Sequence, residues 1–304
     1  MGQYNFDQIV DRTHTKSLKY DFAVKRGKPA DVLPFWVADM DFEIPPELKQ
    51  ILLDRVKHGV FGYTESDDEY FEVLKNWFAT RFNWTPEQKW LVKTPGIVFA
   101  LAMAVRAFTE VGEGVLINQP VYYPFSMVID DNNRRLINVP LIKGDEKYTI
   151  DFEGIERAII EENVTLFLLC NPHNPVGRVW TEDELKRLGD ICIKHNVLIV
   201  SDEIHADFVW KGHTHKVFAA LGESYAEHCI VCTAPSKTFN IAGLQVSNIF
   251  IPNDSLRRRF IKEIDRAGYS QLNTMGIVGC EGAYKVGAPW LDELKEYIQD
   301  NIQF

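Results

Sequence analysis

The feature that most constrains the fold of this chain is an alternation, from about residue 90 onward, of short apolar runs with amphipathic stretches of helical length. The strand candidates are GVLIN (114–118), RLINVPL (135–141), VTLFLLC (164–170), VLIVSD (197–202), CIVCTA (229–234) and SNIFIP (247–252). Several of these runs are apolar on successive residues, as expected of strands that are covered on both faces. We therefore expect a three-layer α/β fold in which helices cover both faces of a mostly parallel sheet.

Two stretches carry clear helix signals. TEDELKRLGDICIKHN (181–196) opens with Thr181 as N-cap and has Glu184 three residues later, which is a capping box, and its apolar residues then fall on one face. KTPGIVFALAMAVRAF (93–108) predicts a glycine-containing turn that leads into an apolar helix. The free N–H groups at the start of such a helix form an anion site.

Charge and composition exclude several classes of protein. The 33 basic and 43 acidic side chains give a formal net charge of −10, whereas nucleic-acid binding needs a positive field, so we expect no nucleic-acid partner. We expect no membrane association, because no apolar stretch approaches the roughly 18 residues of a membrane span. Five cysteines without a framework spacing, and a charged N-terminus without a signal-peptide core, indicate a cytoplasmic protein.

Polar side chains follow the expected strands at one edge of the sheet. They are Asn171 and Asn174 after 164–170, Asp202 at the end of 197–202, Ser236 and Lys237 after 229–234, and Tyr122 and Tyr123 after 114–118. Because ligands bind at the carboxyl ends of the strands in such sheets, we expect these residues to form a site. A lysine, an acid, an asparagine, an aromatic ring and a helix start are the set that pyridoxal phosphate needs.

Each member of this set has a chemical task. The lysine amine forms a Schiff base with the cofactor aldehyde, and a carboxylate keeps the pyridine nitrogen protonated so that the ring accepts electrons. An asparagine amide donates to the 3′ oxygen, an aromatic ring stacks on the pyridine face, and backbone N–H groups with a hydroxyl hold the phosphate. Each piece alone is also typical of ordinary turns, loops and packing. The prediction rests on their common order in NPHNPVG, SDEIHADF and SKTFNIAG.

These motifs, together with WVADMDF in 35–42, resemble a known family. The chain resembles the fold-type I pyridoxal-phosphate enzymes of the aspartate-aminotransferase superfamily. Within it, the chain is similar to the MalY/PatB-type C–S lyases, also called cystathionine β-lyases. The resemblance runs from residue 35 to residue 301, which is nearly the whole chain.

The resemblance implies a role for each residue of the expected site. Lys237 is the Schiff-base lysine and the general base. The other cofactor contacts are Asp202 at the pyridinium nitrogen, Asn174 at the 3′ oxygen, Tyr122 (or, less favoured, Tyr123) stacked on the ring, Gly96, Ile97, Val98 and Ser236 at the phosphate, and Tyr63 reaching the phosphate of the neighbouring subunit. The substrate pocket is lined by Trp36, Val37 and Ala38. The active unit implied is a homodimer that acts on a small amino-acid substrate.

Departures from the aminotransferase pattern favour the lyase branch. His205 stands three residues after the aspartate, where aminotransferases of this superfamily commonly carry tyrosine. Gln245 stands eight residues after the lysine, where they commonly carry arginine. His205 is then a cofactor-binding residue or a satisfied core histidine. Ala234 replaces a frequent phosphate-binding serine, so phosphate binding is expected to rest on Ser236 and the helix start.

The activity expected from this resemblance is the α,β-elimination of L-cystathionine or a related cysteine S-conjugate to a thiol, pyruvate and ammonia. Two alternatives stay open: an aminotransferase on the same scaffold, and a non-catalytic binding or regulatory protein. The second alternative is suggested by length, because chains of this family continue beyond YIQDNIQF. The arginine that clamps the substrate α-carboxylate is assigned to no residue of this chain.

The expected domain organisation follows from the same comparison. Residues 1–45 are expected to form an N-terminal segment, part of the small domain and entry to the substrate pocket, and 46–285 the large cofactor-binding domain. Residues 286–304 are expected to begin an inter-domain helix, without the remainder of the small domain. Outside the site, the aromatic stretch 68–84 is expected to be helical core or dimer packing. KGHTHK (211–216) is expected to be an exposed loop rather than a metal site, and the glycine-rich 264–287 is not a nucleotide site.

Overall fold

The structure is a computed structural model that describes residues 2–304. Its strands are β1 (Leu91–Thr94), β2 (Gly114–Ile117), β3 (Arg135–Asn138), β4 (Ile142–Lys143), β5 (Tyr148–Thr149), β6 (Leu166–Cys170), β7 (Leu198–Asp202), β8 (Cys229–Thr233) and β9 (Ser247–Phe250). Its α-helices are α1 (Pro46–His58), α2 (Asp68–Phe82), α3 (Ile97–Phe108), α4 (Pro124–Asp130), α5 (Phe152–Glu162), α6 (Glu182–Lys194), α7 (Glu223–Ala226), α8 (Pro235–Thr238), α9 (Asp254–Arg266), α10 (Thr274–Val286) and α11 (Ala288–Gln303). Short 3₁₀ turns lie at Val24–Arg26, Gln88–Trp90, Phe218–Leu221 and Ala242–Leu244.

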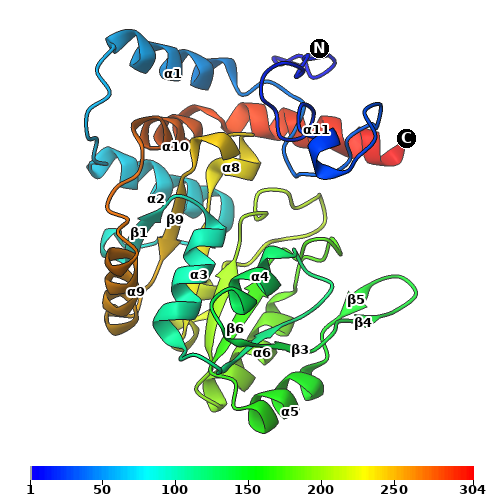
Figure 1. Cartoon of the computed structure of the whole chain (residues 1–304), viewed down its shortest axis with the longest axis vertical. Coiled ribbons are helices and arrows are strands. Elements are labelled where there is room, and N and C mark those ends of the chain that lie inside the picture. The colour runs from blue at the N-terminus through cyan, green and yellow to red at the C-terminus, as the bar shows by residue number, and fades with distance from the viewer. Residues whose placement is uncertain (1) are drawn as a thin grey trace.

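A seven-stranded sheet of order β1-β9-β8-β7-β6-β2-β3 forms the centre of the molecule (Figure 1). Strands β3, β2, β6, β7 and β8 run parallel to one another, and β9 runs antiparallel to both β8 and β1. The mostly parallel sheet predicted from the apolar runs is therefore confirmed. The carboxyl ends of the parallel strands and of β1 lie at the same edge of this sheet.

All six predicted strands are present, with small differences at their ends. The run 135–141 is shorter than expected, because β3 ends at Asn138. Strand β1 was not predicted: its four residues, LVKT, alternate between half-buried and buried, and the sequence offers only a weak strand signal there. The capping box at Thr181 is present, with Glu184 donating its backbone N–H to the threonine hydroxyl.

Helices cover both faces of the sheet, which confirms the three-layer architecture. Helices α3, α4 and α9 pack on one face, and α2, α5, α6 and α10 pack on the other (Figure 1). Successive residues of one strand pack against opposite layers. Leu168 packs in the core on the α3, α4 and α9 side, Leu169 packs in the core on the α2, α5, α6 and α10 side, and both are buried. This double burial is why the strands are apolar on successive residues.

The aromatic stretch 68–84 and the glycine-rich 264–287 both contribute helices to the core. In α2, one face buries Tyr70, Leu74, Trp77 and Phe78, as the core interpretation predicted. In α10, a Cβ atom at Gly279 would lie 2.4 Å from Leu244 Cδ1, so the small residue permits close packing. Gly279 thus serves the close packing of α10.

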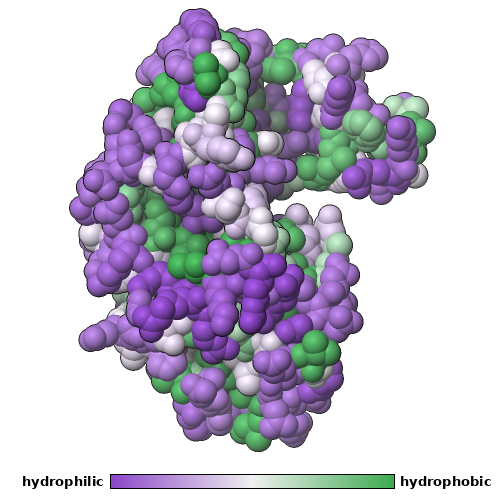
Figure 2. All heavy atoms as spheres, turned by 60° about the vertical axis from the view of Figure 1, so that its left-hand side comes forward, coloured by the Kyte–Doolittle hydropathy of each residue, from purple (hydrophilic) through white to green (hydrophobic). Residues whose placement is uncertain are grey.

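The N-terminal segment packs against α11, far along the chain. Phe6 lies within 5.4–5.7 Å, ring centroid to centroid, of Phe42, Trp290 and Tyr297. Figure 2 shows a deep hollow on one side of the molecule. It lies between the upper part of the view, where Figure 1 places α1, α10, α11 and the N-terminal segment, and the lower part that contains the sheet. No helix within residues 2–304 has the length and apolarity needed to cross a membrane.

Candidate active site

Asp202 stands at the carboxyl end of β7, in the middle of the sheet. It pairs in register with Cys170 of β6 on one side and Cys232 of β8 on the other, and its side chain is buried. One carboxylate oxygen accepts a hydrogen bond from the Ile204 N–H at 3.1 Å. Burial, with a further contribution from the Glu203 charge, raises the pKa of Asp202 to about 7. The fold therefore buries the Asp202 carboxyl group at a place where nearby positive charge does not compensate for the cost of its negative charge.

Lys237 lies in α8, immediately after β8, and its amine faces the N-terminal segment. The Nζ atom donates a hydrogen bond to the Ala38 carbonyl oxygen at 2.8 Å. Burial lowers the pKa of this amine, while the charges of Asp39 and Asp202 act in the opposite direction. The lysine is thus a partly desolvated base beside a buried acid, as the motif order predicted.

Three further predicted residues lie at this edge. The Tyr122 N–H donates to the Asn174 carbonyl oxygen at 3.0 Å, which joins the loops after β2 and β6. Asn174 and His205 line a common cavity of about 320 Å³. Burial, together with the Lys237 charge, lowers the pKa of His205 to about 4, so its ring is neutral at pH 7. Tyr122 is about two-fifths exposed and Tyr123 is more exposed, which favours Tyr122 as the ring against a bound ligand.

The start of α3 lies at the same edge, two strands away from α8 in the sheet order. Gly96 precedes the helix, and its N-terminus carries neither a side-chain cap nor an acidic residue in its first turn. A Cβ atom at Gly96 would meet no atom within 4 Å, so the space beside Gly96 at the helix start is open. Such a helix start attracts an anion. Ser236 is half-buried in α8, beside Lys237.

The segment Trp36–Ala38 approaches the site from the N-terminal part of the chain. Val37 has φ 61°, which is the left-handed region, where a β-branched residue is an outlier. The Trp36 indole N–H is buried and has no hydrogen-bond partner within residues 2–304. Backbone strain of this kind persists where surrounding contacts enforce it, and it is typical of ligand sites.

Two predicted positions lie away from this cluster. Tyr63 is 99% exposed, on the loop between α1 and α2. In KGHTHK, His213 is exposed as expected, but the expectation for His215 was wrong. His215 is buried, its Nε2 lies 2.9 Å from a Glu203 carboxylate oxygen, and its ring packs edge-on against Phe82. Its partners are remote in sequence, so the local pattern gave no signal.

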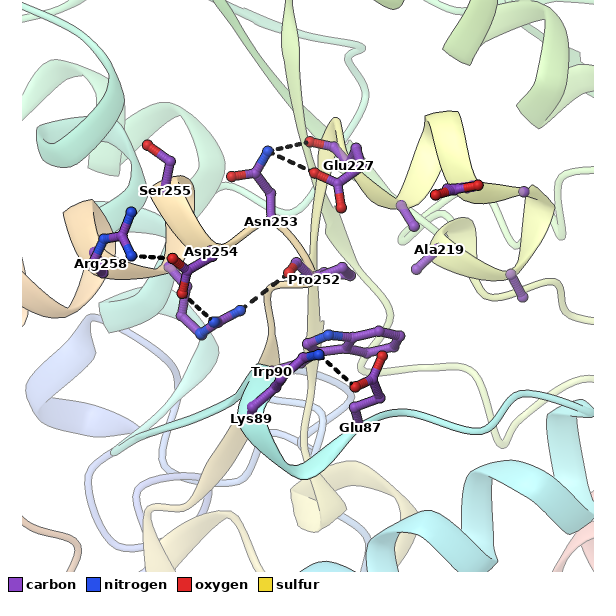
Figure 3. Close-up of a pocket in the computed structure, with 15 residues that line it drawn as sticks. Glu87, Lys89, Trp90, Ala219, Glu227, Pro252, Asn253, Asp254, Ser255 and Arg258 are labelled. Carbon is purple, nitrogen blue, oxygen red and sulfur yellow. Dashed lines mark hydrogen bonds and ion pairs between the residues drawn. The ribbon is translucent and has the colours of Figure 1, made fainter.

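A larger cavity of about 890 Å³ lies at the opposite edge of the sheet, between the starts of β1 and β8 and the end of β9 (Figure 3). Its cationic and anionic groups neutralise one another: Lys89 pairs with Glu87, and Arg257 and Arg258 pair with Asp254. None of the predicted site residues lines it. The candidate active site is therefore the carboxyl edge around Asp202 and Lys237.

Comparison with known proteins agrees with this assignment. The sequence profile of the family described as aminotransferase class I and II matches residues 30–304. The chain belongs to the class I and II aminotransferase family. Cystathionine β-lyase PatB of Bacillus subtilis is 44% identical over 98% of this chain and 77% of its own length, and protein MalY of Escherichia coli is 34% identical over 99% and 77%. The crystal structure of cystalysin from Treponema denticola, which contains a pyridoxal 5′-phosphate cofactor, has a TM-score of 0.94 and 41% identity, over 98% of this chain and 76% of that one.

The residues at the carboxyl edge of the sheet fit pyridoxal phosphate. The raised pKa of Asp202 is that of a buried carboxylate in need of a cation, which a protonated pyridine nitrogen supplies. The uncapped α3 start and the open space at Gly96 fit a phosphate group. The Lys237 amine is near enough to Asp202 for their charges to interact, so one bound molecule can reach both groups.

The structure also brings to the site residues that the sequence motifs contained but to which they assigned no role. Asp39 acts on the Lys237 amine through its charge. Asp207 accepts hydrogen bonds from the Thr238 hydroxyl at 2.7 Å and the Trp77 indole at 3.2 Å, which anchors α8. Asn240 contacts the segment that follows Ala38. All three lie within the quoted motifs, but their partners are too distant in sequence to be found by pattern.

Proposed function

We propose that this chain is a pyridoxal-phosphate-dependent C–S β-lyase that cleaves L-cystathionine or related cysteine S-conjugates. The observation that carries the proposal is the partly desolvated Lys237 amine beside the fully buried Asp202 carboxyl group, at the carboxyl edge of the sheet. The similarity to cystathionine β-lyase PatB, at 44% identity, supports this reaction among those of the family.

The chain's own residues divide the chemical work as follows. Pyridoxal phosphate, when bound, supplies an aldehyde that takes up the substrate amine and a ring that accepts the electron pair of the α-carbon. Lys237 removes the α-proton, because its lowered pKa leaves more of the neutral base at working pH. The Ala38 carbonyl orients the lysine amine, and Asp202 stabilises positive charge at the ring nitrogen.

The leaving group departs once the α-proton has been removed. The electron pair left at the α-carbon forms a double bond to the β-carbon as the C–S bond breaks, and the electron pair of the C–S bond leaves with the thiolate. The 2-aminoacrylate that is released hydrolyses to pyruvate and ammonia. An aminotransferase on the same scaffold would instead need a keto-acid acceptor, and the residues His205 and Gln245 favour the lyase.

The test is to load the purified chain with pyridoxal phosphate, add L-cystathionine without a keto acid, and follow pyruvate. We expect pyruvate from the wild type, and a loss on the order of 10²–10⁴-fold or more in Lys237→Ala, because the general base is removed. Keto-acid formation only when an amino acceptor is added would favour the aminotransferase. Pyruvate release at the wild-type rate by Lys237→Ala would contradict the proposal.

We also propose that the active unit is a homodimer in which Tyr63 reaches the phosphate site of the neighbouring subunit. The support is that Tyr63 is exposed on a loop whose Val60 and Phe61 are exposed as well, which leaves an apolar patch without a cover in the single chain. A cytoplasmic location is proposed because all five cysteines are buried free thiols.

The domain division is likewise a proposal. Within the described residues, 2–45 and 286–304 pack on each other through Phe6, Trp290 and Tyr297. The Glu293 carboxylate also accepts the Gln3 and Tyr4 N–H groups. These contacts support one unit made of both ends of the chain, beside a large domain of residues 46–285.

A further inference from the structure

The segment Trp36–Phe42 needs support from outside itself. Val37 adopts φ 61°, and the next turn is closed by a hydrogen bond of 2.9 Å from the Asp39 N–H to the Val37 carbonyl oxygen. Val37 and Ala38 are exposed, so apolar packing does not hold this conformation. It matters for the site because it aims the Ala38 carbonyl at the Lys237 amine, 2.8 Å away.

Asn240 holds this segment from the side of the lysine. It lies three residues after Lys237, and its carboxamide makes three hydrogen bonds to the backbone of the segment. Asn240 Oδ1 accepts the Met40 N–H at 2.9 Å, and Asn240 Nδ2 donates to the Met40 and Phe42 carbonyl oxygens, each at 2.9 Å. A carboxamide is the smallest side chain that both accepts and donates in this way. Asn240 itself has φ 56°, a conformation that asparagine tolerates.

A second set of contacts holds the same segment from the N-terminal side. Arg12 donates to both carboxylate oxygens of Asp39, at 3.0 and 2.9 Å, and Lys19 donates to Asp41 at 2.9 Å. Although burial opposes it, the hydrogen bonds from these cations lower the pKa of Asp41. This ionic cluster fixes the segment to residues 12–19. Its contacts do not reach α8. The segment is joined to the stretch that carries Lys237 by the three hydrogen bonds of the Asn240 side chain and by the hydrogen bond from Lys237 itself to the Ala38 carbonyl oxygen.

We propose that Asn240 is a positioning residue of the active site: it fixes the segment Trp36–Phe42 relative to α8, and so keeps the Ala38 carbonyl in register with the Lys237 amine. The inference rests on the proposed function of Lys237 as the base. Displacing a catalytic group by about 1 Å lowers rates on the order of 10²-fold. The effect falls mainly on kcat, because the base is misplaced while Asp202, Asn174 and the α3 start still hold the cofactor.

The test compares Asn240→Asp with Asn163→Asp in the pyridoxal-phosphate-loaded protein. In Asn240→Asp, a carboxylate oxygen replaces the amide that donates to two carbonyl oxygens, so repulsion replaces both hydrogen bonds. Asn163 also has a left-handed backbone, φ 51°, but is exposed at the end of α5, and serves as the matched control. Asn240→Gly is the second variant, because glycine keeps the left-handed backbone, removes the carboxamide and adds no charge.

Two readouts are taken. The first is kcat and KM for pyruvate release, where we expect both Asn240 variants to lose on the order of 10²-fold, chiefly in kcat, and Asn163→Asp to match the wild type. The second is hydrogen exchange of the Met40 amide, with and without pyridoxal phosphate. We expect faster exchange in residues 36–42 of the Asn240 variants, with unchanged protection of α2.

The outcomes separate the inference from the function on which it rests. A wild type that forms no pyruvate contradicts the proposed lyase, whatever the exchange shows. An active wild type, with Asn240 variants that keep its kcat or its slow Met40 exchange, overturns the positioning role. Variants that lose stability everywhere, with uniform acceleration of exchange across α2 and residues 36–42, would show a general structural role and also overturn it.

Discussion

At the scale of single residues, the site contains titratable groups whose pKa values are shifted by burial toward their neutral forms. Asp202 is the clearest case, because burial outweighs the opposing charge of Lys237 and raises the pKa of the Asp202 carboxyl group to about 7. In the cofactor-free chain, the folded state therefore keeps a proton that the unfolded chain releases near its ordinary pKa of 3.8. The contribution of Asp202 to the free energy of unfolding is present at low pH and is lost as pH rises through about 7.

This pH dependence of the free energy of unfolding gives a prediction for Asp202→Asn. Without cofactor, the variant should be more stable than the wild type at about pH 8, by up to about 4 kcal/mol, and the difference should shrink toward about pH 4.5. Urea unfolding at the two pH values measures it. His205, whose lowered pKa favours stability as pH rises to about 6.5, is present in both proteins and cancels.

The same variant should lose activity after loading with pyridoxal phosphate. Loss of the charge at the ring nitrogen is expected to lower kcat on the order of 10²–10³-fold. A gain in stability with a loss of turnover would identify a residue retained for chemistry. An equal stability difference at both pH values would show that Asp202 is not the titrating group.

At the scale of elements, α8 is held in place by a contact outside its own turn. Thr238 is buried next to Lys237, and its hydroxyl donates to the buried Asp207 carboxylate. Thr238→Val keeps the shape and leaves that carboxylate with the Trp77 indole as its remaining side-chain donor. We expect a loss of about 1–3 kcal/mol in the free energy of unfolding.

The control for this variant is Thr214→Val, in an exposed loop, which should stay within about 0.5 kcal/mol of the wild type. Chemical denaturation of all three proteins gives the comparison. If Thr238→Val proved as stable as Thr214→Val, the anchoring of α8 through Asp207 would be wrong.

The elements also show what the sequence could and could not predict. The six apolar runs predicted six strands, because strands covered on both faces must be apolar throughout. Strand β1 was not predicted, because Lys93 and Thr94 break its apolar pattern and its partner β9 lies more than 150 residues away in the sequence. The motifs around Asp202 and Lys237 predicted residues that the structure brings to the carboxyl edge of the sheet, and their roles there stay a prediction. They could not predict the partners of Asn240, Asp207 and His215, because these contacts depend on tertiary packing.

At the scale of the whole molecule, the proposed dimer makes a distinct prediction. If Tyr63 serves the neighbouring site, Tyr63→Phe should bind pyridoxal phosphate more weakly, with a loss of about 1–3 kcal/mol for a hydrogen bond to a charged group. In a two-fold dimer, a mixture of Tyr63→Phe and Lys237→Ala chains forms hybrids with one intact site, made of Lys237 from one chain and Tyr63 from the other.

Mixing experiments at cofactor concentrations that barely load Tyr63→Phe test this arrangement. We expect the mixture to exceed the summed activity of the two separate variants, and sedimentation to give the mass of a dimer. Activity equal to the sum, or a monomeric mass for an active protein, would contradict the shared site.

The antiparallel pairing of β9 with β8 has a mechanical consequence. Strand β9 lies directly beside β8, which precedes it in the chain. The stretch between them, which carries Lys237, is therefore attached at both of its ends to neighbouring strands of the sheet. If a crossover helix joined β8 to a parallel strand, one end of this stretch would be attached to a helix in an outer layer. A shift of that helix would then also move the lysine side chain. Here the connection is short, so the position of the amine is set by the sheet itself.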